Sequence, residues 1–406
     1  MKTKFLQLTT LCLLCVISVA FTSCNKNKVE NNKLASITIQ NAKALFISSS
    51  NNEAKLYGIQ SSALKSSDED EIFEIKYLNS AGEEIIKSNP REIYNLKDFV
   101  VLVFETYETY LVNKSSGKVY ELLSQEYVLD YECSRFLGMK PFQESENNNL
   151  YFVRYKSGEA KLFKLSLSNL SSLQFEQVSA VNDHIYHFCV DKVGDIFYAA
   201  YNGTSDNIDR YRKADGSFVI PNFGYILKIW VGTDGQMYAI QGQGKIVNDK
   251  LVVMLSTIQD GVFTPIKEVH FRGFENKIFY VQGKMICAHD GMLFNIANEN
   301  DYSETPCALT PTHAINNELY NFDKETFKLT KIDVSTGTTS LVSNFDKTKL
   351  GNYDIGNIIN VSVSGITFSA TDLRNGNYVV AKISTDNSVV IQTTITGTIG
   401  TVVSLN

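Results

Sequence analysis

Short runs rich in Val, Ile, Thr, Tyr and Phe recur along most of the chain, and clusters of Gly, Asn and Asp separate them. Runs of this composition, bounded by turn-forming residues, are typical of β-strands joined by tight hairpins. No stretch of twelve residues shows the apolar period of an amphipathic helix. The hydrophobic pattern therefore predicts an all-β protein.

The strand pattern also repeats along the chain. An aliphatic residue followed closely by an aromatic one, just after turn-forming residues, occurs eight times at intervals of 41 to 47 residues. A second turn signal follows each of these pairs. The pairs are Leu56/Tyr57, Val103/Phe104, Leu150/Tyr151, Ile196/Phe197, Met237/Tyr238, Ile278/Phe279, Leu319/Tyr320 and Ile366/Phe368, and the second signals are Gly82, Gly117, Asn169, Gly216, Gly261, Asn300, Gly337 and Asn387.

Each repeated unit has room for two hairpins, or four strands. Four-stranded units repeated at about 44 residues predict a β-propeller of about eight four-stranded blades, or seven if the first and last units share one. Two packed β-domains and a β-solenoid are the alternatives. Residues 401–405 form one more strand-like stretch after the last hairpin. We expect this stretch to pair with the first unit and close the ring.

The N-terminus has the pattern of an export signal. Lys2 and Lys4 precede an uncharged, largely apolar run over residues 5–21, which is too short to span a bilayer comfortably. Small residues up to Ser23 then lead into Cys24. This junction resembles the lipobox of bacterial lipoproteins, in which the signal is cut before the cysteine and the thiol is acylated.

The predicted organisation follows from that junction. An ordinary signal peptide without lipidation is the alternative. We expect a lipoprotein signal peptide over residues 1–23, lipidation at Cys24, a polar tether over 24–33 and a β-propeller domain over 34–406.

The Asn- and Lys-rich N-terminal region and the Ser23–Cys24 junction resemble outer-membrane lipoproteins of Bacteroidota. The rest of the chain resembles propeller lipoproteins of that group in its pattern only. This resemblance implies an outer-membrane location with a lipid anchor, and it carries no functional residues across. Surface-exposed members tend to have an acidic run after the cysteine, whereas only Glu30 is present here, so either side of the membrane stays open.

Better-known propeller repeats do not fit the chain. It contains no Trp-Asp dipeptide at blade ends and no Gly-Gly doublet, and Trp230 is its only tryptophan. Asp333, Thr336 and Gly337 resemble the hairpin end of pyrroloquinoline-quinone-type repeats. The tryptophan that those repeats pack between blades is absent, so we expect no quinone and no other cofactor.

Charge excludes one class of partner. The chain has 38 Lys and Arg against 44 Asp and Glu, a net charge of −6, and no cluster of basic residues. Nucleic acid is therefore not an expected partner. The expected partners are the membrane, through the lipid anchor, and a protein or a glycan.

Several residues that can carry chemistry also have a plain structural interpretation. His184 and His187 could share a metal on a helix, but their neighbours indicate a strand, on which residues three apart point to opposite faces. His289 and Asp290 could form an acid–base pair, but they precede a glycine in an expected turn. His270 and His313 have no sequence partner. The acidic run Asp68, Glu69, Asp70 and Glu71 is expected to be a solvated loop rather than a Ca²⁺ site.

Four cysteines besides Cys24 remain in the expected mature chain: Cys133, Cys189, Cys287 and Cys307. Cys287 and Cys307 could form a disulfide in an oxidising compartment, or both could be buried free thiols. Trp230 is flanked by Ile229 and Val231, which favours a place in the core over a sugar-stacking platform.

No catalytic motif is present, so we assign no catalytic, cofactor-binding or metal-binding residue. The interpretation that fits best is a non-catalytic propeller that binds a protein or glycan at the cell envelope, because function in propellers usually resides in variable loops. A carbohydrate-active hydrolase or lyase, with acid and base drawn from different blades, is the first alternative. A structural assembly or sensor component is the second, and an exposed apolar patch would favour it.

Overall fold

The computed structural model describes most of the chain after the predicted tether. The described residues are 33–405 except 40, 51–52, 62–69, 124–126, 129–140, 157–158, 180–183, 192–193, 202–209, 214–217, 220–223, 232–235, 248–249, 260–261, 272–276, 283, 290–291, 297–301, 316, 324, 363–364, 385 and 396. Cys24, Cys133, Asp68, Glu69 and Asp290 therefore lie outside the described residues, as do the predicted signal peptide and nearly all of the tether.

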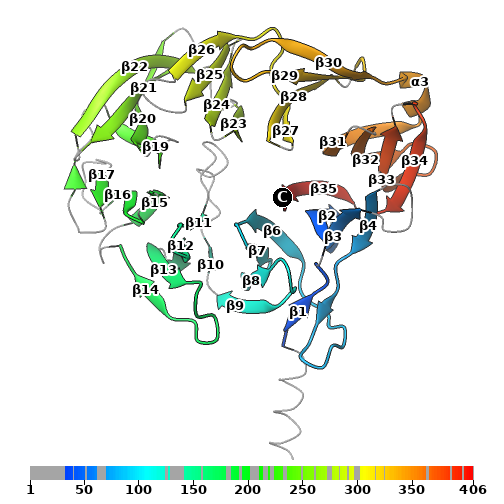
Figure 1. Cartoon of the computed structure of the whole chain (residues 1–406), viewed down its shortest axis with the longest axis horizontal. Coiled ribbons are helices and arrows are strands. Elements are labelled where there is room, and N and C mark those ends of the chain that lie inside the picture. Colours follow the sequence, from blue (N-terminus) through cyan, green and yellow to red (C-terminus); the bar gives the residue numbers. More distant parts are fainter. Residues whose placement is uncertain are drawn as a thin grey trace, which may run out of the picture.

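Antiparallel sheets follow one another around a ring, with the first strand of each sheet nearest the centre and the last at the rim (Figure 1). In the described part of the chain, six of these sheets consist of four consecutive strands. They are β6 (Pro90–Asn95), β7 (Phe99–Phe104), β8 (Thr109–Asn113) and β9 (Val119–Leu123); β15 (His184–Val190), β16 (Ile196–Tyr201), β17 (Arg210–Lys213) and β18 (Phe218–Val219); β19 (Tyr225–Val231), β20 (Met237–Val247), β21 (Lys250–Gln259) and β22 (Val262–Phe271); β23 (Lys277–Val281), β24 (Lys284–His289), β25 (Met292–Ile296) and β26 (Tyr302–Pro306); β27 (His313–Ile315), β28 (Glu318–Asp323), β29 (Lys328–Ile332) and β30 (Thr339–Asn344); β31 (Tyr353–Ser362), β32 (Gly365–Asp372), β33 (Asn377–Ser384) and β34 (Val389–Thr394).

Two further sheets of the ring depart from this plan. One has the order β35-β2-β3-β4, so its innermost strand comes from the C-terminal end of the chain. In the other, two short strands both pair with β12, which gives five strands. The first comprises β35 (Thr398–Ser404), β2 (Ala42–Ser50), β3 (Glu53–Ser61) and β4 (Asp70–Glu74), and the second β10 (Tyr127–Val128), β11 (Phe142–Glu144), β12 (Asn149–Lys156), β13 (Glu159–Ser166) and β14 (Phe175–Gln177).

The other elements in the described residues are small. Strands β1 (Ser36–Ile37) and β5 (Tyr77–Leu78) pair with each other beside the first sheet. The four-residue helix α3 (Lys347–Leu350) begins after Asp346, whose carboxylate accepts a hydrogen bond from the Thr348 N–H. The described residues contain no helix long and apolar enough to cross a membrane.

The predicted all-β propeller is confirmed, but only six of its sheets in the described residues are the regular four-stranded blades that the sequence predicted. In the sheet β35-β2-β3-β4 the chain's first unit supplies three strands and the C-terminal stretch the fourth, and the segment before β12 adds two short strands instead of one. The sequence predicted the C-terminal strand of the first sheet but not the additional strand beside β12.

Closure of the ring by the C-terminal stretch is confirmed. Strand β35 pairs antiparallel with β2, with Val403 opposite Leu45 and Val402 opposite Phe46. The Leu405 N–H also donates to the Lys43 carbonyl at 2.7 Å. The strand begins three residues before the stretch that the sequence indicated.

The aliphatic–aromatic pairs mostly mark the second strand of a sheet. This holds for the pairs in β7, β12, β16, β20, β28 and β32. The pair Ile278/Phe279 instead lies in the first strand, β23, and Leu56/Tyr57 lies in β3, the third strand of the composite sheet. The even spacing of the pairs therefore concealed a shift of one strand in two units.

The core lies between neighbouring sheets rather than within one. Val101 and Leu111 of the sheet β6–β9 pack with Leu150 and Phe152 of β12, and all four side chains are fully buried. Each buried side chain of this kind contributes about 1.5–3 kcal/mol relative to an exposed one. A blade therefore gains its stability from the blades on either side of it.

Five-residue turns that begin with Asp or Asn join several strand pairs. In the turn Asp333–Gly337, the Asp333 carboxylate accepts from the N–H groups of Ser335 at 2.9 Å and Thr336 at 2.8 Å. Gly337 has φ of +67°, and a Cβ there would lie 2.1 Å from the Pro306 carbonyl oxygen of the preceding sheet. The residues that resemble a quinone-type repeat are thus explained by turn geometry and close inter-blade packing.

A substitution at Gly397 would test whether the pairing of β35 with β2 stabilises the protein. A Cβ at this position would lie 2.0 Å from the Ser49 carbonyl oxygen, whereas a Cβ at Gly400 would meet nothing within 4 Å. We expect Gly397→Ala to lower the free energy of unfolding by about 1–3 kcal/mol, as overpacking does. Gly400→Ala, the matched control, should change it by about 0.5 kcal/mol or less.

The stability of both variants would be measured by thermal and urea unfolding. The same measurement on a chain lacking residues 397–406 should show a melting temperature lower by many degrees. Equal stability of the two alanine variants, or an unchanged melting temperature after the deletion, would contradict the role assigned to β35.

Candidate ligand-binding site

A hollow of about 960 Å³ opens where three neighbouring sheets meet near the centre of the ring. It lies at the ends of the innermost strands β35, β6 and β11, on the face where each first strand turns into the second, which we call the inner-turn face. Strand β35 lies close to the centre of the ring in Figure 1. The lining residues are Asn95, Leu96, Lys97, Lys114, Phe142, Gln143, Glu144, Ser145, Glu146, Asn148 and Leu405.

Polar contacts between sheets hold the rim of this hollow. The Glu144 carboxylate accepts the Lys97 N–H at 2.9 Å, which joins the β11–β12 turn to the β6–β7 turn. Lys114 Nζ donates to the carbonyl oxygens of Lys97 at 2.9 Å and Leu405 at 3.1 Å. This ammonium group therefore links Leu405 to the sheet β6–β9. Lys114 and Leu405 are 291 residues apart in sequence.

Burial lowers the pKa of the Lys114 ammonium, while the nearby carboxylates of Asp98 and Glu144 act in the opposite direction. The two carbonyl oxygens that accept from Nζ replace part of the water that the ammonium loses. Lys114 is thus a fixed donor in the wall of the hollow rather than a freely rotating surface lysine.

The apolar part of the hollow is closely packed. The Phe142 ring is 3% exposed and lies 5.1 Å from the Tyr94 ring and 6.0 Å from the Phe152 ring, measured between centroids. Gln143 Nε2 donates to the Phe188 carbonyl at 2.8 Å, which fixes β11 against the next blade. The walls are therefore formed before any ligand binds.

The lining is polar and balanced in charge. Lys97 and Lys114 are matched by Glu144 and Glu146, and Asn95 and Asn148 are among the amide side chains that complete it. Amides donate and accept hydrogen bonds, as do sugar hydroxyls. The hollow suits an uncharged polar ligand better than an apolar or strongly charged one.

None of these residues belongs to a motif that predicts a function from the sequence. The hollow arises where three turns and the C-terminal end meet, so no single motif marks it.

The histidines lie elsewhere. His187 is buried in β15 at 2% exposure, and a bulge between Ile185 and His187 places His184 opposite Tyr201 and His187 opposite Ala199. The strict alternation assumed for this strand is therefore wrong, because Tyr186 is the extra residue of the bulge. Nevertheless, within the described residues no group of three His, Cys, Asp or Glu side chains could hold a metal ion.

The other histidines are also separate from the hollow. His313 Nδ1 lies 2.8 Å from Thr312 Oγ1 in a local contact. His270 and His289 belong to β22 and β24, and their side chains lie outside the described residues, as does Asp290.

The prediction of a solvated loop is wrong for Asp70 and Glu71, the part of the acidic run that the structure describes. Asp70 and Glu71 begin strand β4, and the exposed Glu71 carboxylate accepts from Gln60 Nε2 at 3.1 Å across the sheet. The charge of these two residues fits a rim strand, because edge strands commonly carry charge. Asp68 and Glu69 lie outside the described residues.

The predicted alternative of buried free thiols holds for Cys189 and Cys307. Burial raises the pKa of the Cys189 thiol. Cys307 follows β26 and Cys287 lies in β24, with β25 between them. Two strand spacings of about 4.8 Å exceed the roughly 7 Å between Cα atoms that a disulfide can bridge, so this pair is not bonded.

The prediction that Trp230 belongs to the core is confirmed. The residue is 8% exposed, and its ring stacks on Tyr238 with centroids 5.5 Å apart. It offers no platform for a sugar ring.

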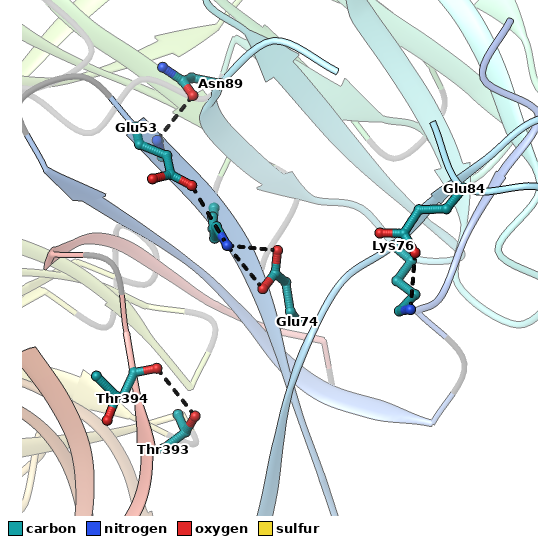
Figure 2. Close-up of polar contacts among 9 residues, drawn as sticks. Glu53, Glu74, Lys76, Glu84, Asn89, Thr393 and Thr394 are labelled. Carbon is teal, nitrogen blue, oxygen red and sulfur yellow. Dashed lines mark hydrogen bonds and ion pairs between the residues drawn. The ribbon is translucent and has the colours of Figure 1, made fainter. Parts of the chain in front are cut away.

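Exposed ion pairs of the first sheet do not form a second site. Lys55 Nζ lies 3.6 Å from Glu53 and 3.3 Å from Glu74, and Lys76 Nζ lies 3.0 Å from Glu84 (Figure 2). These side chains are 35–61% exposed, and such pairs contribute little. They provide control positions for the buried contacts described above.

The comparisons with known proteins concern the fold alone. No protein-family model matches the chain, and no curated protein matches its sequence. Among solved structures, apo AztD from Citrobacter koseri is 12% identical, with a TM-score of 0.46, over 91% of this chain and 98% of that one. A Lactobacillus plantarum protein is 11% identical, with a TM-score of 0.36, over 89% and 96% of the two chains.

A puromycin hydrolase structure is also similar, with 13% identity and a TM-score of 0.46 over 76% of this chain. The matched region spans only 54% of that hydrolase. At this level of similarity no activity is transferred to the present chain.

Lys114→Met should test how the hollow is held together. The substitution keeps an apolar stem and removes the donor to two carbonyl groups, so we expect a loss of about 1–2 kcal/mol in the free energy of unfolding. Lys76→Met, which breaks only the exposed pair with Glu84, should cost about 0.5 kcal/mol or less. Urea midpoints would compare them; a Lys114 variant as stable as the Lys76 variant would show that the ammonium bridge is not structural.

Proposed function

We propose that this protein is a lipid-anchored, non-catalytic propeller of the cell envelope that binds a glycan or protein partner at the inner-turn face. The observation that carries the binding part is the hollow, whose rim is fixed by Glu144 and Lys114 and whose lining offers both donors and acceptors. Its volume of about 960 Å³ lies toward the upper end of the range of about 300–1,000 Å³ found for ligand sites. The balanced charge favours an uncharged glycan segment as the ligand.

The lipid anchor is supported by the sequence around Cys24. Acyl chains contribute about 0.8 kcal/mol per buried CH₂, and two chains hold a protein stably at a membrane. The tether over residues 24–33 would reach roughly 30 Å at about 3.3 Å per residue. The outer membrane of a Bacteroidota-type envelope is the location that the resemblance supports.

One observation favours a second candidate function. Glu144 and Glu146 line the same hollow, and a pair of carboxylates is what a glycoside hydrolase requires. Glu144 is engaged with the Lys97 N–H, which fixes its position. A carbohydrate-active enzyme is therefore the alternative to simple binding.

Ligand binding would be tested with the immobilised protein and a panel of neutral and acidic polysaccharides, together with solubilised envelope from the native organism. We expect retention of a neutral glycan, and loss of retention in the double variant Asn95→Arg, Glu146→Arg, which fills the hollow with bulk and positive charge. Thr106→Arg, in the β7–β8 turn at the opposite end of the blade, is the control and should bind as the unaltered protein does.

The retained material separates the candidate functions. A glycan released intact supports binding, and one released shortened establishes the enzyme instead. Retention of a stoichiometric protein that survives the double variant would overturn the assignment of the hollow as the site.

Lipidation would be tested by metabolic labelling with a palmitate analogue. We expect label in the full chain and in Cys133→Ser, and none in Cys24→Ser, because only the cysteine at the predicted cleavage junction is acylated. The unaltered chain should partition with membranes. Label that persists after Cys24→Ser, or an unlabelled wild-type chain, would contradict the proposed anchor.

A further inference from the structure

The described chain enters the ring at its rim, beside the outermost strand of the sheet β6–β9. Strand β1 lies next to β9 (Figure 1), and the Val119 N–H donates to the Ala35 carbonyl at 2.9 Å. Lys33, the first described residue, pairs with Glu121 of β9 at 3.2 Å. Going back from Ala35 to Lys33, the chain therefore follows β9 toward the end of that strand.

The predicted tether thus begins close to the turn that joins β7 and β8. Leu123, the last residue of β9, lies opposite Thr109, the first residue of β8 after that turn. Lys33 lies beside Glu121, which is two residues, or about 7 Å of strand, short of Leu123. A tether that reaches roughly 30 Å would therefore keep the β7–β8 turn near the membrane that holds the lipid at Cys24.

Tyr107 in this turn has a backbone conformation that its residue type disfavours. Its φ of +64° lies in the left-handed region, which glycine and asparagine adopt far more readily than a bulky aromatic residue. The side chain is 40% exposed. Strained positions of this kind often serve a function, and an aromatic ring with a polar tip suits the boundary between lipid headgroups and hydrocarbon.

Ile86 projects from the segment that packs against the same turn. Its side chain is 99% exposed, although both of its neighbours are fixed. The Ile85 N–H donates to the Tyr77 carbonyl at 2.8 Å, and Lys87 Nζ lies 2.7 Å from the Glu108 carboxylate. The backbone therefore holds this isoleucine out into solvent.

Ile86 and Tyr107 belong to one surface, because the residues that directly follow them, Lys87 and Glu108, form that ion pair. We call Ile86 and Tyr107 the tether-side patch. An aliphatic side chain next to a tyrosine can enter the outer part of a bilayer, where apolar area and aromatic rings both stabilise binding.

The carboxylates near the patch are engaged within the protein. The Glu84 carboxylate pairs with Lys76 at 3.0 Å (Figure 2), and the Glu105 carboxylate accepts from Asn89 Nδ2 at 3.0 Å. No excess of basic side chains attracts anionic lipid here. The patch therefore suits a zwitterionic lipid surface, to which apolar side chains rather than charge supply the contact.

We propose that the tether-side patch inserts into the surface of the membrane to which the chain is anchored. This inference rests on the lipid anchor proposed above. Isolated exposed apolar residues are ordinary on protein surfaces, but here the tether ends beside the patch and brings it to a lipid surface. The inner-turn face lies at the other end of these strands, so the hollow stays open to a ligand while the patch is in contact with lipid.

The test uses the lipidated full chain on phosphatidylcholine vesicles, with and without brominated acyl chains that quench tryptophan fluorescence. The native Trp230 is buried in another blade and provides a constant background. For Ile86→Trp we expect the added emission to shift to shorter wavelength and to fall about twofold or more on brominated vesicles. Val262→Trp is the control: Val262 is 62% exposed on β22, across the ring from β1 (Figure 1), and its emission should not change.

A second substitution separates lipid contact from folding. Tyr107→Asn relieves the unfavourable φ, so the melting temperature should stay the same or rise. The same substitution in the Ile86→Trp chain should reduce the quenching, because the aromatic contact with the headgroup layer is lost. Unchanged quenching would overturn the role assigned to Tyr107.

Flotation of the lipidated chain with the vesicles distinguishes the two proposals. A chain that floats but shows no quenching for Ile86→Trp, or equal quenching for Val262→Trp, would overturn the contact of the tether-side patch and leave the anchor in place. A chain that does not float would overturn the anchor and, with it, this inference.

Discussion

The antiparallel pairing of β35 with β2 joins the C-terminal end of the described chain to its first long strand, and the ring is closed by that contact. The chain's own order leaves the first sheet with three strands and an open inner edge, and β35 fills that edge. Ser48 Oγ donates to the Gly397 carbonyl and accepts from the Gly397 N–H, both at 3.0 Å. Such a close approach of two backbones explains why a residue without a side chain stands at 397.

Closure matters beyond one sheet because the core lies between blades. Each inter-blade cluster is completed by side chains from two sheets, so an unpaired first sheet would leave the clusters on both sides of it incomplete. The hollow depends on the same contact. Leu405 forms part of its wall, and Lys114 holds the Leu405 carbonyl, so the candidate site exists only in the closed ring.

The sequence predicted the propeller because buried strands need aliphatic and aromatic residues at regular intervals, and these are visible without a structure. It failed where the same pattern fits two strands: Ile278 and Phe279 of β23 look like the second-strand pairs of other blades. It also missed the hollow, because Lys114 and Leu405 meet only after the ring closes, 291 residues apart. Cys287 and Cys307 are the opposite case, because they are near in sequence but separated in the sheet by β25.

In a closed ring, exposed strand edges that could pair with other chains remain at the rim but not at the centre. Inner strands can be uncharged because neighbouring blades surround them, whereas each outermost strand faces solvent and needs protection of its own. The acidic run that begins β4 is explained in this way, and so are the prolines of β22 and β26. Strands β30 and β34 carry neither charge nor proline, but a β-bulge interrupts the hydrogen-bonding edge of each. Every rim strand in the described residues therefore has a feature that opposes pairing with another chain.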